Sequence, residues 1–143
     1  MNINQIRFQV LLIFGGCVLS QTTQAQVFEI KNASKRYDVK ITTNCTDRSC
    51  DGQANIDLYL KGTTQRFQRF SSAELTMDLD ETDKPSVNVV QLYGEQSAVI
   101  FADFNFDGSE DVAIRNGNYG AYGGPTYDVY VFHRTKNKFV LSQ

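Results

Sequence analysis

The segment from residue 103 to residue 111, D-F-N-F-D-G-S-E-D, carries the side chains of this sequence that are best suited to chemistry. Its oxygen-bearing side chains recur at alternate positions, and Gly108 stands where the backbone must turn sharply. Ca²⁺ takes about six to eight oxygen ligands, which alternate residues of a curled loop can direct at one centre. We therefore predict a calcium site made by Asp103, Asn105, Asp107 and Asp111, with the backbone carbonyl of Ser109 as a further ligand.

The rest of this loop should adapt to the ion. Phe104 and Phe106 alternate with the ligands, so we expect them to point away from the ion and pack on the core. Without a cation, the three crowded aspartates would have raised pKa values and would loosen the loop. The loop is not an EF-hand, because its twelfth position is Ile114 and apolar strands flank it. The simpler alternative is an Asp-Gly hairpin whose acids face water.

A second loop, N-G-N-Y-G-A-Y-G-G-P, follows at residues 116–125. It contains too many glycines for a regular element, and it leads us to expect a long, mobile, exposed loop. Its Tyr119 and Tyr122 are amphipathic side chains of the kind that enter a partner's pocket. The alternative is that both tyrosines fold back and cap the sheet. A phosphate-binding loop is excluded, because no G-K-[ST] follows.

The chain begins with an export signal. Arg7 precedes an apolar run of 12 residues from Phe8 to Leu19, and Thr23-Gln24-Ala25 offers a cleavage site with small residues. The run is shorter than the roughly 18 to 20 residues of a membrane-spanning helix. We expect a signal peptide at 1–25, cleaved after Ala25, and a single domain at 26–143. A lipid anchor on Cys17 is the alternative reading of the same segment.

Cys45 and Cys50 remain after such cleavage. An even pair of cysteines in an exported chain predicts a disulfide, which for so short a closed loop contributes about 2 kcal/mol. Zinc or redox chemistry is the alternative, but the spacing C-x₄-C differs from C-x-x-C. The lone histidine, His133, is also distant in sequence.

The 118 residues after position 25 suit one domain, and their composition gives no sign of nucleic-acid binding. They contain 13 Lys and Arg against 16 Asp and Glu, for a formal charge of −3. Short β-branched or alternating runs predict an antiparallel all-β chain. The expected strands are 27–31, 37–43, 55–61, 74–78, 87–93, 98–104, 111–115, 127–133 and 139–141.

An enzyme requires a group that attacks or moves protons, and the candidates are poor. His133 lies at the end of an expected strand, where a core or strand-end role is the simpler one. The aspartates in register are already assigned as metal ligands. We therefore predict that the protein is not an enzyme.

The segment from Phe101 to Phe132 resembles the calcium-binding periplasmic immunity proteins of bacterium-killing type IV secretion systems. The resemblance lies in three consecutive runs, F-x-D-x-N-x-D-G-x-x-D-V-A-I-R-N-G, then Y-G-G-P, then Y-D-V-Y-V-F. The calcium loop itself resembles those of FG-GAP-type propeller blades. The resemblance covers about 30 residues, and the preceding strands match only in general character.

This resemblance implies a propeller-like β fold, a periplasmic location and Ca²⁺ as the bound ion. It also implies a lysozyme-like glycan hydrolase as the protein partner. The loop would block the cleft of that hydrolase, with partner-binding residues Asn118, Tyr119, Tyr122 and Tyr127. Members of the family continue through further strands after the position of Gln143, so an open sheet edge is expected here. The alternative is a calcium-stabilised adhesion or carbohydrate-binding module that uses the same tyrosines to stack on sugars.

Overall fold

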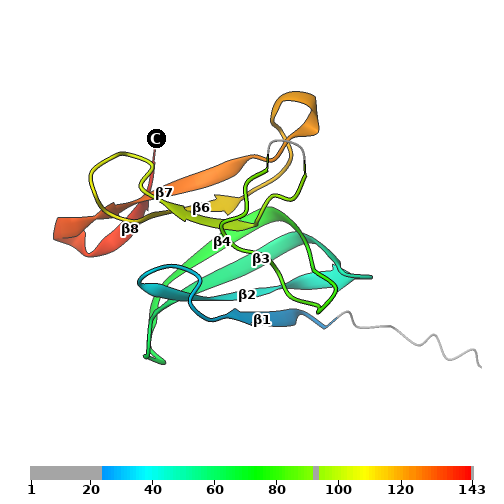
Figure 1. The fold of residues 1–143 in the computed structure, drawn as a ribbon, viewed down its shortest axis with the longest axis horizontal. Helices are drawn as coiled ribbons and strands as arrows, with labels where there is room; N and C mark the ends of the chain where they lie inside the picture. The colour runs from blue at the N-terminus through cyan, green and yellow to red at the C-terminus, as the bar shows by residue number, and fades with distance from the viewer. Residues whose placement is uncertain (1–23, 92–93, 143) are drawn as a thin grey trace, which may run out of the picture.

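The computed structural model describes residues 24–91 and 94–142; the predicted signal up to residue 23, with Cys17, lies outside them. The described chain forms two antiparallel sheets in which neighbours in sequence are neighbours in space (Figure 1). The first sheet contains β1 (Gln26–Ile30), β2 (Tyr37–Thr46), β3 (Ser49–Leu60) and β4 (Arg66–Asp78). The second contains β5 (Val99–Ala102), β6 (Asp111–Arg115), β7 (Tyr127–His133) and β8 (Lys138–Leu141). The prediction of an antiparallel all-β chain is confirmed.

Alternation of apolar and polar residues builds the first sheet. In β2 and β3 the pairs Val39 with Leu58 and Ile41 with Ile56 lie opposite each other, and all four side chains are buried. Side chains two residues apart point to the same face of a strand, so these pairs form one apolar surface. That surface is the side of the sheet on which the second sheet packs.

Aromatic rings connect the two sheets. The Tyr37 ring of β2 lies 5.4 Å from that of Phe67 in β4 and 5.5 Å from that of Phe139 in β8. The rings of Phe70 in β4 and Tyr130 in β7 are 4.6 Å apart. Each such pair contributes about 0.5–1.5 kcal/mol beyond its buried area. The two sheets therefore share one core.

The edge strand β8 also receives hydrogen bonds from the first sheet. The amide N–H of Phe139 donates to Oε1 of Gln68 (2.9 Å), and Nε2 of Gln68 donates to the carbonyl of Phe139 (3.0 Å). A glutamine amide thus replaces a neighbouring strand at this residue. Pairing of edge groups in this way reduces their tendency to recruit another chain.

The connection between the sheets differs from the prediction. Residues 87–93 were expected to form a strand, but the described part of this range contains one isolated bridge, Val90 with Gln96, and Leu92 and Tyr93 lie outside the described residues. In contrast, β4 begins eight residues earlier than predicted, at Arg66. The sheets form two open meanders, and a propeller ring is not shown. Among the described residues, no helix is long and apolar enough to cross a membrane.

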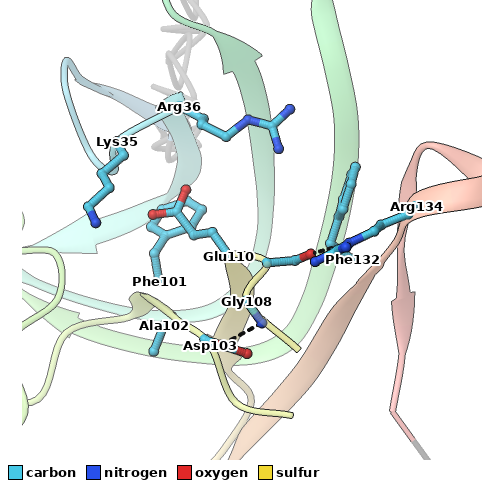
Figure 2. A pocket seen from close by; sticks show the side chains of 10 residues that line it. Lys35, Arg36, Phe101, Ala102, Asp103, Gly108, Glu110, Phe132 and Arg134 are labelled. Atoms are coloured by element: carbon cyan, nitrogen blue, oxygen red, sulfur yellow. Dashed lines mark hydrogen bonds between the residues drawn. The ribbon is translucent and has the colours of Figure 1, made fainter. Parts of the chain in front are cut away.

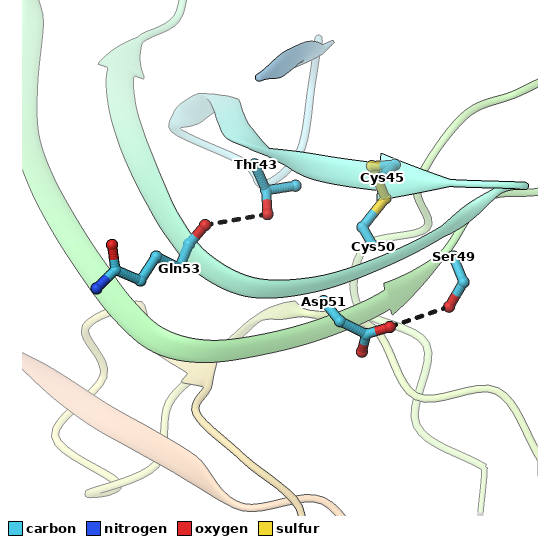
Figure 3. The surroundings of a disulfide bond; sticks show 6 residues. All are labelled: Thr43, Cys45, Ser49, Cys50, Asp51 and Gln53. Atoms are coloured by element: carbon cyan, nitrogen blue, oxygen red, sulfur yellow. Dashed lines mark hydrogen bonds between the residues drawn. A yellow bond between two sulfur atoms is a disulfide. The ribbon is translucent and has the colours of Figure 1, made fainter. Parts of the chain in front are cut away.

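The predicted disulfide is confirmed: Cys45 and Cys50 face each other across β2 and β3 and are bonded (Figure 3). The bond closes the hairpin beside the turn at Asp47 and Arg48, both of which have positive φ. Cys50 is fully buried. The pairing follows from the register, because opposite residues in an antiparallel pair bring their Cβ atoms within reach of a disulfide.

Candidate functional site

The predicted calcium loop connects β5 to β6, and its side-chain oxygens turn toward the amides of the loop itself. Asp103 accepts hydrogen bonds from the N–H groups of Asp107 (3.0 Å) and Gly108 (2.8 Å). Asn105 Oδ1 accepts from the Asp107 N–H (3.1 Å), and Asp107 Oδ1 accepts from the Ser109 N–H (2.7 Å). Gly108 has φ +82°, a conformation that other residues rarely adopt. Local hydrogen bonds thus curl the loop as the spacing predicts.

Asp111 has a different environment from the other four predicted ligands. It begins β6 and is fully buried. Its Oδ1 accepts from the N–H of Phe132 in β7 (2.8 Å), and its Oδ2 accepts from the N–H of Phe104 (3.0 Å). These bonds satisfy the carboxylate and fix the end of the loop to the second sheet.

A cationic side chain that sequence reasoning missed also holds this loop. Nη2 of Arg134 donates to the carbonyl of Asp107 (2.8 Å), and its Nε donates to Oγ of Ser109 (2.9 Å). The guanidinium is also 3.9 Å from Oδ1 of Asp107. Arg134 is 25 residues from Ser109 in sequence, so no local pattern indicates the contact.

Two expectations about the loop do not hold at Asp107 and Phe106. The pKa of Asp107 is lowered, mainly by the hydrogen bond from the Ser109 N–H, with smaller contributions from Asn105 and Arg134. The bonds inside the loop therefore outweigh repulsion between carboxylates at this residue. Phe106 does not pack on the core but is 91% exposed, and its backbone has φ +59°.

The fit of this loop to Ca²⁺ has two sides. All the candidate ligand atoms are oxygens, as a hard cation requires. Each carboxylate oxygen that accepts a hydrogen bond keeps a further lone pair for a metal ion. However, no three Asp, Glu, His or Cys side chains converge as metal ligands within residues 24–91 and 94–142. The donor chemistry therefore fits calcium, and the carboxylates would have to approach one another further around the ion.

The loop also forms one wall of a cavity between the two sheets. The cavity has a volume of about 740 Å³, and Lys35 and Arg36 of the β1–β2 connection line its opposite wall (Figure 2). Glu110 crosses between the walls, because its Oε2 accepts a hydrogen bond from the hydroxyl of Ser34 (2.8 Å). The calcium loop is therefore linked directly to the first sheet.

The tyrosine loop, residues 116–125, joins β6 to β7, and its own hydrogen bonds hold its backbone. At its base, Asn116 N–H donates to the carbonyl of Thr126 (2.9 Å), and Thr126 N–H donates to that of Gly117 (3.0 Å). At its tip, Gly120 N–H donates to the carbonyl of Gly124 (2.9 Å) around a 3-10 turn at Ala121–Gly123. Paired backbone groups limit the motion of a glycine-rich segment.

Asn116 fastens this loop to the first sheet, a role that the sequence did not reveal. Its Oδ1 accepts from the N–H groups of Ala73 (3.2 Å) and Glu74 (3.2 Å), both in β4. Its Nδ2 donates to Oδ2 of Asp128 in β7 (2.9 Å). One side chain thus connects β4, β6 and β7. An asparagine directly after a predicted strand was the only signal that pointed to it.

The four predicted partner-binding residues differ in how far they are exposed to solvent. Tyr122 is fully exposed at the tip, with φ +57°. Tyr119 is 73% exposed, and its hydroxyl donates to Glu74, which raises the pKa of Tyr119. Asn118 is exposed and bonds to Arg115. The partly buried Tyr127 lies at the base, where its hydroxyl donates to the carbonyl of Ser97 (2.9 Å).

The molecule is electrically polarised along its strands. We define the basic end as residues 31–38, 61–66, 103–111 and 134–138, which lie at the left of Figure 1. Its eight Lys and Arg against five Asp and Glu leave a charge of +3. The acidic end comprises residues 47–51, 74–91, 94–98 and 115–128. Its three Lys and Arg against nine Asp and Glu leave −6. The tyrosine loop lies at the acidic end and the calcium loop at the basic end.

Comparisons with known proteins give a likeness in fold to a solved structure. No protein-family model matches the sequence, and no curated protein matches it. A solved structure, that of a Xanthomonas type IV secretion system related protein, is similar with a TM-score of 0.56 and 21% sequence identity. The alignment covers 76% of this chain and 54% of that one, so this chain spans about half the length of its relative. At this identity, the likeness shows the fold alone.

Proposed function

We propose that this protein is a periplasmic, calcium-binding immunity protein that inhibits a lysozyme-like peptidoglycan hydrolase. It inserts the tip of the tyrosine loop into the active-site cleft of that enzyme and has no catalytic activity of its own. The observation that carries the proposal is Tyr122, a fully exposed aromatic side chain on a loop that hydrogen bonds hold in place. Presenting a large side chain on an ordered loop lowers the entropy lost on binding.

The charge around the tip supports a hydrolase as the partner. Peptidoglycan carries carboxylates, so an enzyme that binds it benefits from cations around its cleft. The acidic end, with a charge of −6, is complementary to such a cleft. Asn118 and Tyr119 would contact its rim, whereas Tyr127 would act by fixing the base of the loop.

Calcium has a structural role in this proposal. The ion would be held by Asp103, Asn105, Asp107 and the Ser109 carbonyl, with Asp111 at the edge of the set. It would stiffen the β5–β6 connection and, through Glu110 and Ser34, the contact between the sheets. Because β6 runs from this loop to the tyrosine loop, the ion would support the loop from the far end of the strand.

The location of the protein is supported by two observations. The Cys45–Cys50 disulfide is compatible with an exported chain. The structural relative is described as related to a type IV secretion system, which supports the same setting here. These observations, together with the resemblance of residues 101–132 to the immunity proteins, favour the periplasm.

An inhibition assay tests the proposal. A lysozyme-like hydrolase, peptidoglycan and Ca²⁺ are mixed with the protein, and the rate of cell-wall solubilisation is measured. We expect inhibition by the wild type and at least about tenfold weaker inhibition by Tyr122→Ala, as for a buried aromatic anchor. The matched control is Phe106→Ala, which removes another highly exposed aromatic, from the basic end, and should inhibit like the wild type. Equal inhibition by Tyr122→Ala and the wild type would refute the tip as the contact.

A carbohydrate-binding module is the second candidate, because the exposed ring of Tyr122 could equally stack on a sugar. The same materials separate the two functions. A module of this kind would sediment with peptidoglycan in the absence of any enzyme and leave hydrolysis unchanged. An inhibitor would bind the enzyme and stop hydrolysis.

A further inference from the structure

The end of the molecule opposite the tyrosine loop carries a feature that the proposed inhibition does not use. Phe106 is 91% exposed, and its backbone has φ +59°, an unfavourable conformation for a bulky aromatic residue. Phe104, two residues earlier, is 38% exposed. The chain therefore bears both local strain and exposed apolar surface at one residue. Backbone strain and exposed apolar surface both cost free energy, and they are retained where the residue contacts another molecule.

Exposed cations gather at the end of the molecule that carries Phe106. They come from three turns of two different sheets: Lys35 and Arg36 from β1–β2, Lys61 and Arg66 from β3–β4, and Arg134, Lys136 and Lys138 from β7–β8. All seven are exposed. Lys61 N–H donates to the carbonyl of Arg36 (3.1 Å), and Arg36 and Arg134 line the same cavity, so the β1–β2 turn adjoins the other two. Positive charge is thus distributed across the whole end.

Two of these cations are free to bind an external anion. Within the described part of the chain, the side chains of Lys35 and Arg36 form no ion pair or hydrogen bond. They line the cavity between the sheets, with Phe101 and Phe132 as apolar lining (Figure 2). The guanidinium of Arg36 lies 5.4 Å from the centroid of the Phe132 ring, a distance typical of a cation–π contact, which leaves its N–H groups available.

The acidic residues at this end reduce its positive charge but do not reverse the sign. Asp111 is buried, Asp103 bonds to loop amides, and Glu110 bonds to Ser34. The end keeps a charge of +3, from eight basic and five acidic residues. A bound divalent cation would make it more positive.

We propose that the basic end is a docking surface for anionic phospholipid, in which Phe106 enters the interfacial region and the surrounding Lys and Arg contact headgroup phosphates. An aromatic side chain flanked by long basic side chains is the arrangement that favours a membrane interface. A lipid surface fits better than one acidic partner pocket, because the cations are spread over the end while the aromatic projects from it. The acidic end then faces away from the membrane, with the tyrosine loop accessible.

Vesicle sedimentation tests the proposal. The chain beginning at Gln26, which contains all eight strands, is mixed with vesicles of phosphatidylglycerol and phosphatidylcholine in equal parts, or of phosphatidylcholine alone. We expect binding to the anionic vesicles only, and a decrease as salt is added. Phe106→Ala should lower the partition coefficient about tenfold. The double change Lys35→Gln and Arg36→Gln should lower it by a similar or larger factor, since each basic residue contributes about fivefold.

Three results would overturn the proposal. The first is no binding to anionic vesicles at low salt with either Ca²⁺ or chelator. The second is equal binding by Phe106→Ala and the wild type. The third is displacement by poly-glutamate at the same charge concentration as the lipid, which would indicate an acidic protein surface as the natural ligand. Tyr122→Ala is the matched control and should bind vesicles like the wild type. Because inhibition and vesicle binding use opposite ends, failure of one does not imply failure of the other.

Discussion

Gly117 is a position at which another residue would displace a neighbouring tyrosine ring. Its φ is +92°, and a Cβ built there would lie 2.3 Å from Cε2 of the Tyr119 ring. The ring therefore lies directly against the glycine, and its hydroxyl bonds to Glu74. Glycine is needed both for the backbone conformation and for the close approach of the ring.

We expect Gly117→Ala to displace the Tyr119 ring and to break its bond to Glu74. The raised pKa of Tyr119 depends mainly on that bond, so it should return toward the ordinary value of about 10. NMR titration of the Tyr119 ring provides the measurement. Gly62→Ala is the control, because Gly62 has φ +75° with no atom near its would-be Cβ. It should cost about 1 kcal/mol of unfolding free energy and leave Tyr119 unchanged. An unshifted pKa in Gly117→Ala would contradict the prediction.

Tyr37 carries an unpaired polar atom in the core. The residue is fully buried, and its hydroxyl has no hydrogen-bond partner among the described residues. Burial without a partner costs free energy, so Tyr37→Phe should leave the unfolding free energy unchanged or raise it by about 1 kcal/mol. Tyr127→Phe is the comparison, because its hydroxyl donates to Ser97 and its loss should cost about 1 kcal/mol. Denaturant unfolding measures both. A larger loss for Tyr37→Phe would show that its hydroxyl is paired.

The outer face of the first sheet depends on a cross-strand row of charges. Lys40 in β2, Asp57 in β3 and Arg69 in β4 lie in register. Asp57 is only 3% exposed, and Arg69 donates to both of its oxygens at 2.7 Å. This bond, more than the charges of Arg69 and Arg66, lowers the pKa of Asp57. A buried acid in the middle of a strand is thus compensated by its neighbours.

This row predicts how the stability depends on pH. A pKa lowered by folding means that protonation favours the unfolded chain. The contribution of Asp57 is therefore complete above about pH 4 and is lost as the pH falls through its folded pKa. Asp57→Asn should be less stable than the wild type at about pH 6, and the difference should shrink at about pH 3. Urea midpoints at both pH values provide the measurement. A difference that is the same at both would refute the assignment.

At the scale of the whole molecule, the calcium loop connects the two sheets. Its Glu110 reaches Ser34 in the first sheet, and Arg134 of the β7–β8 turn holds its backbone. An ion bound in the loop should therefore stabilise the entire fold and not the loop alone. Binding to the folded chain raises the unfolding free energy by about 2.7 kcal/mol at a hundredfold excess over Kd.

We expect Ca²⁺ to raise the thermal midpoint of the wild type and to have little effect on Asp107→Asn. The asparagine keeps an acceptor for the Ser109 N–H but loses the charge. Asp80→Asn is the matched control, because Asp80 caps a similar turn, accepting from the Thr82 and Lys84 N–H groups, in a different connection. It should retain the calcium response. Scanning calorimetry with Ca²⁺ and with chelator is the measurement. No shift at millimolar Ca²⁺, or an equal shift in Asp107→Asn, would exclude this loop as the site.

Local patterns were sufficient for the parts of this protein in which neighbouring residues determine the conformation. The bounds of β6 and β7 agree with the prediction, because their alternation and flanking turn residues lie within a few positions. The Cys45–Cys50 disulfide and the curl around Gly108 also follow from short-range spacing. The oxygen donors of the loop were therefore identifiable from sequence, although their use by calcium stays a prediction.

Tertiary contacts decided the rest. Residues 87–91 have strand-like composition, but their few backbone hydrogen bonds to residues 95–99 give only an isolated bridge, Val90 with Gln96, and not a strand. Arg134 reaches the calcium loop, and Asn116 fastens the tyrosine loop, through contacts that follow from sheet register. The separation of charge into two ends likewise depends on which turns face the same way. A sequence specifies side chains and local geometry, whereas packing of the two sheets determines which distant groups share a surface.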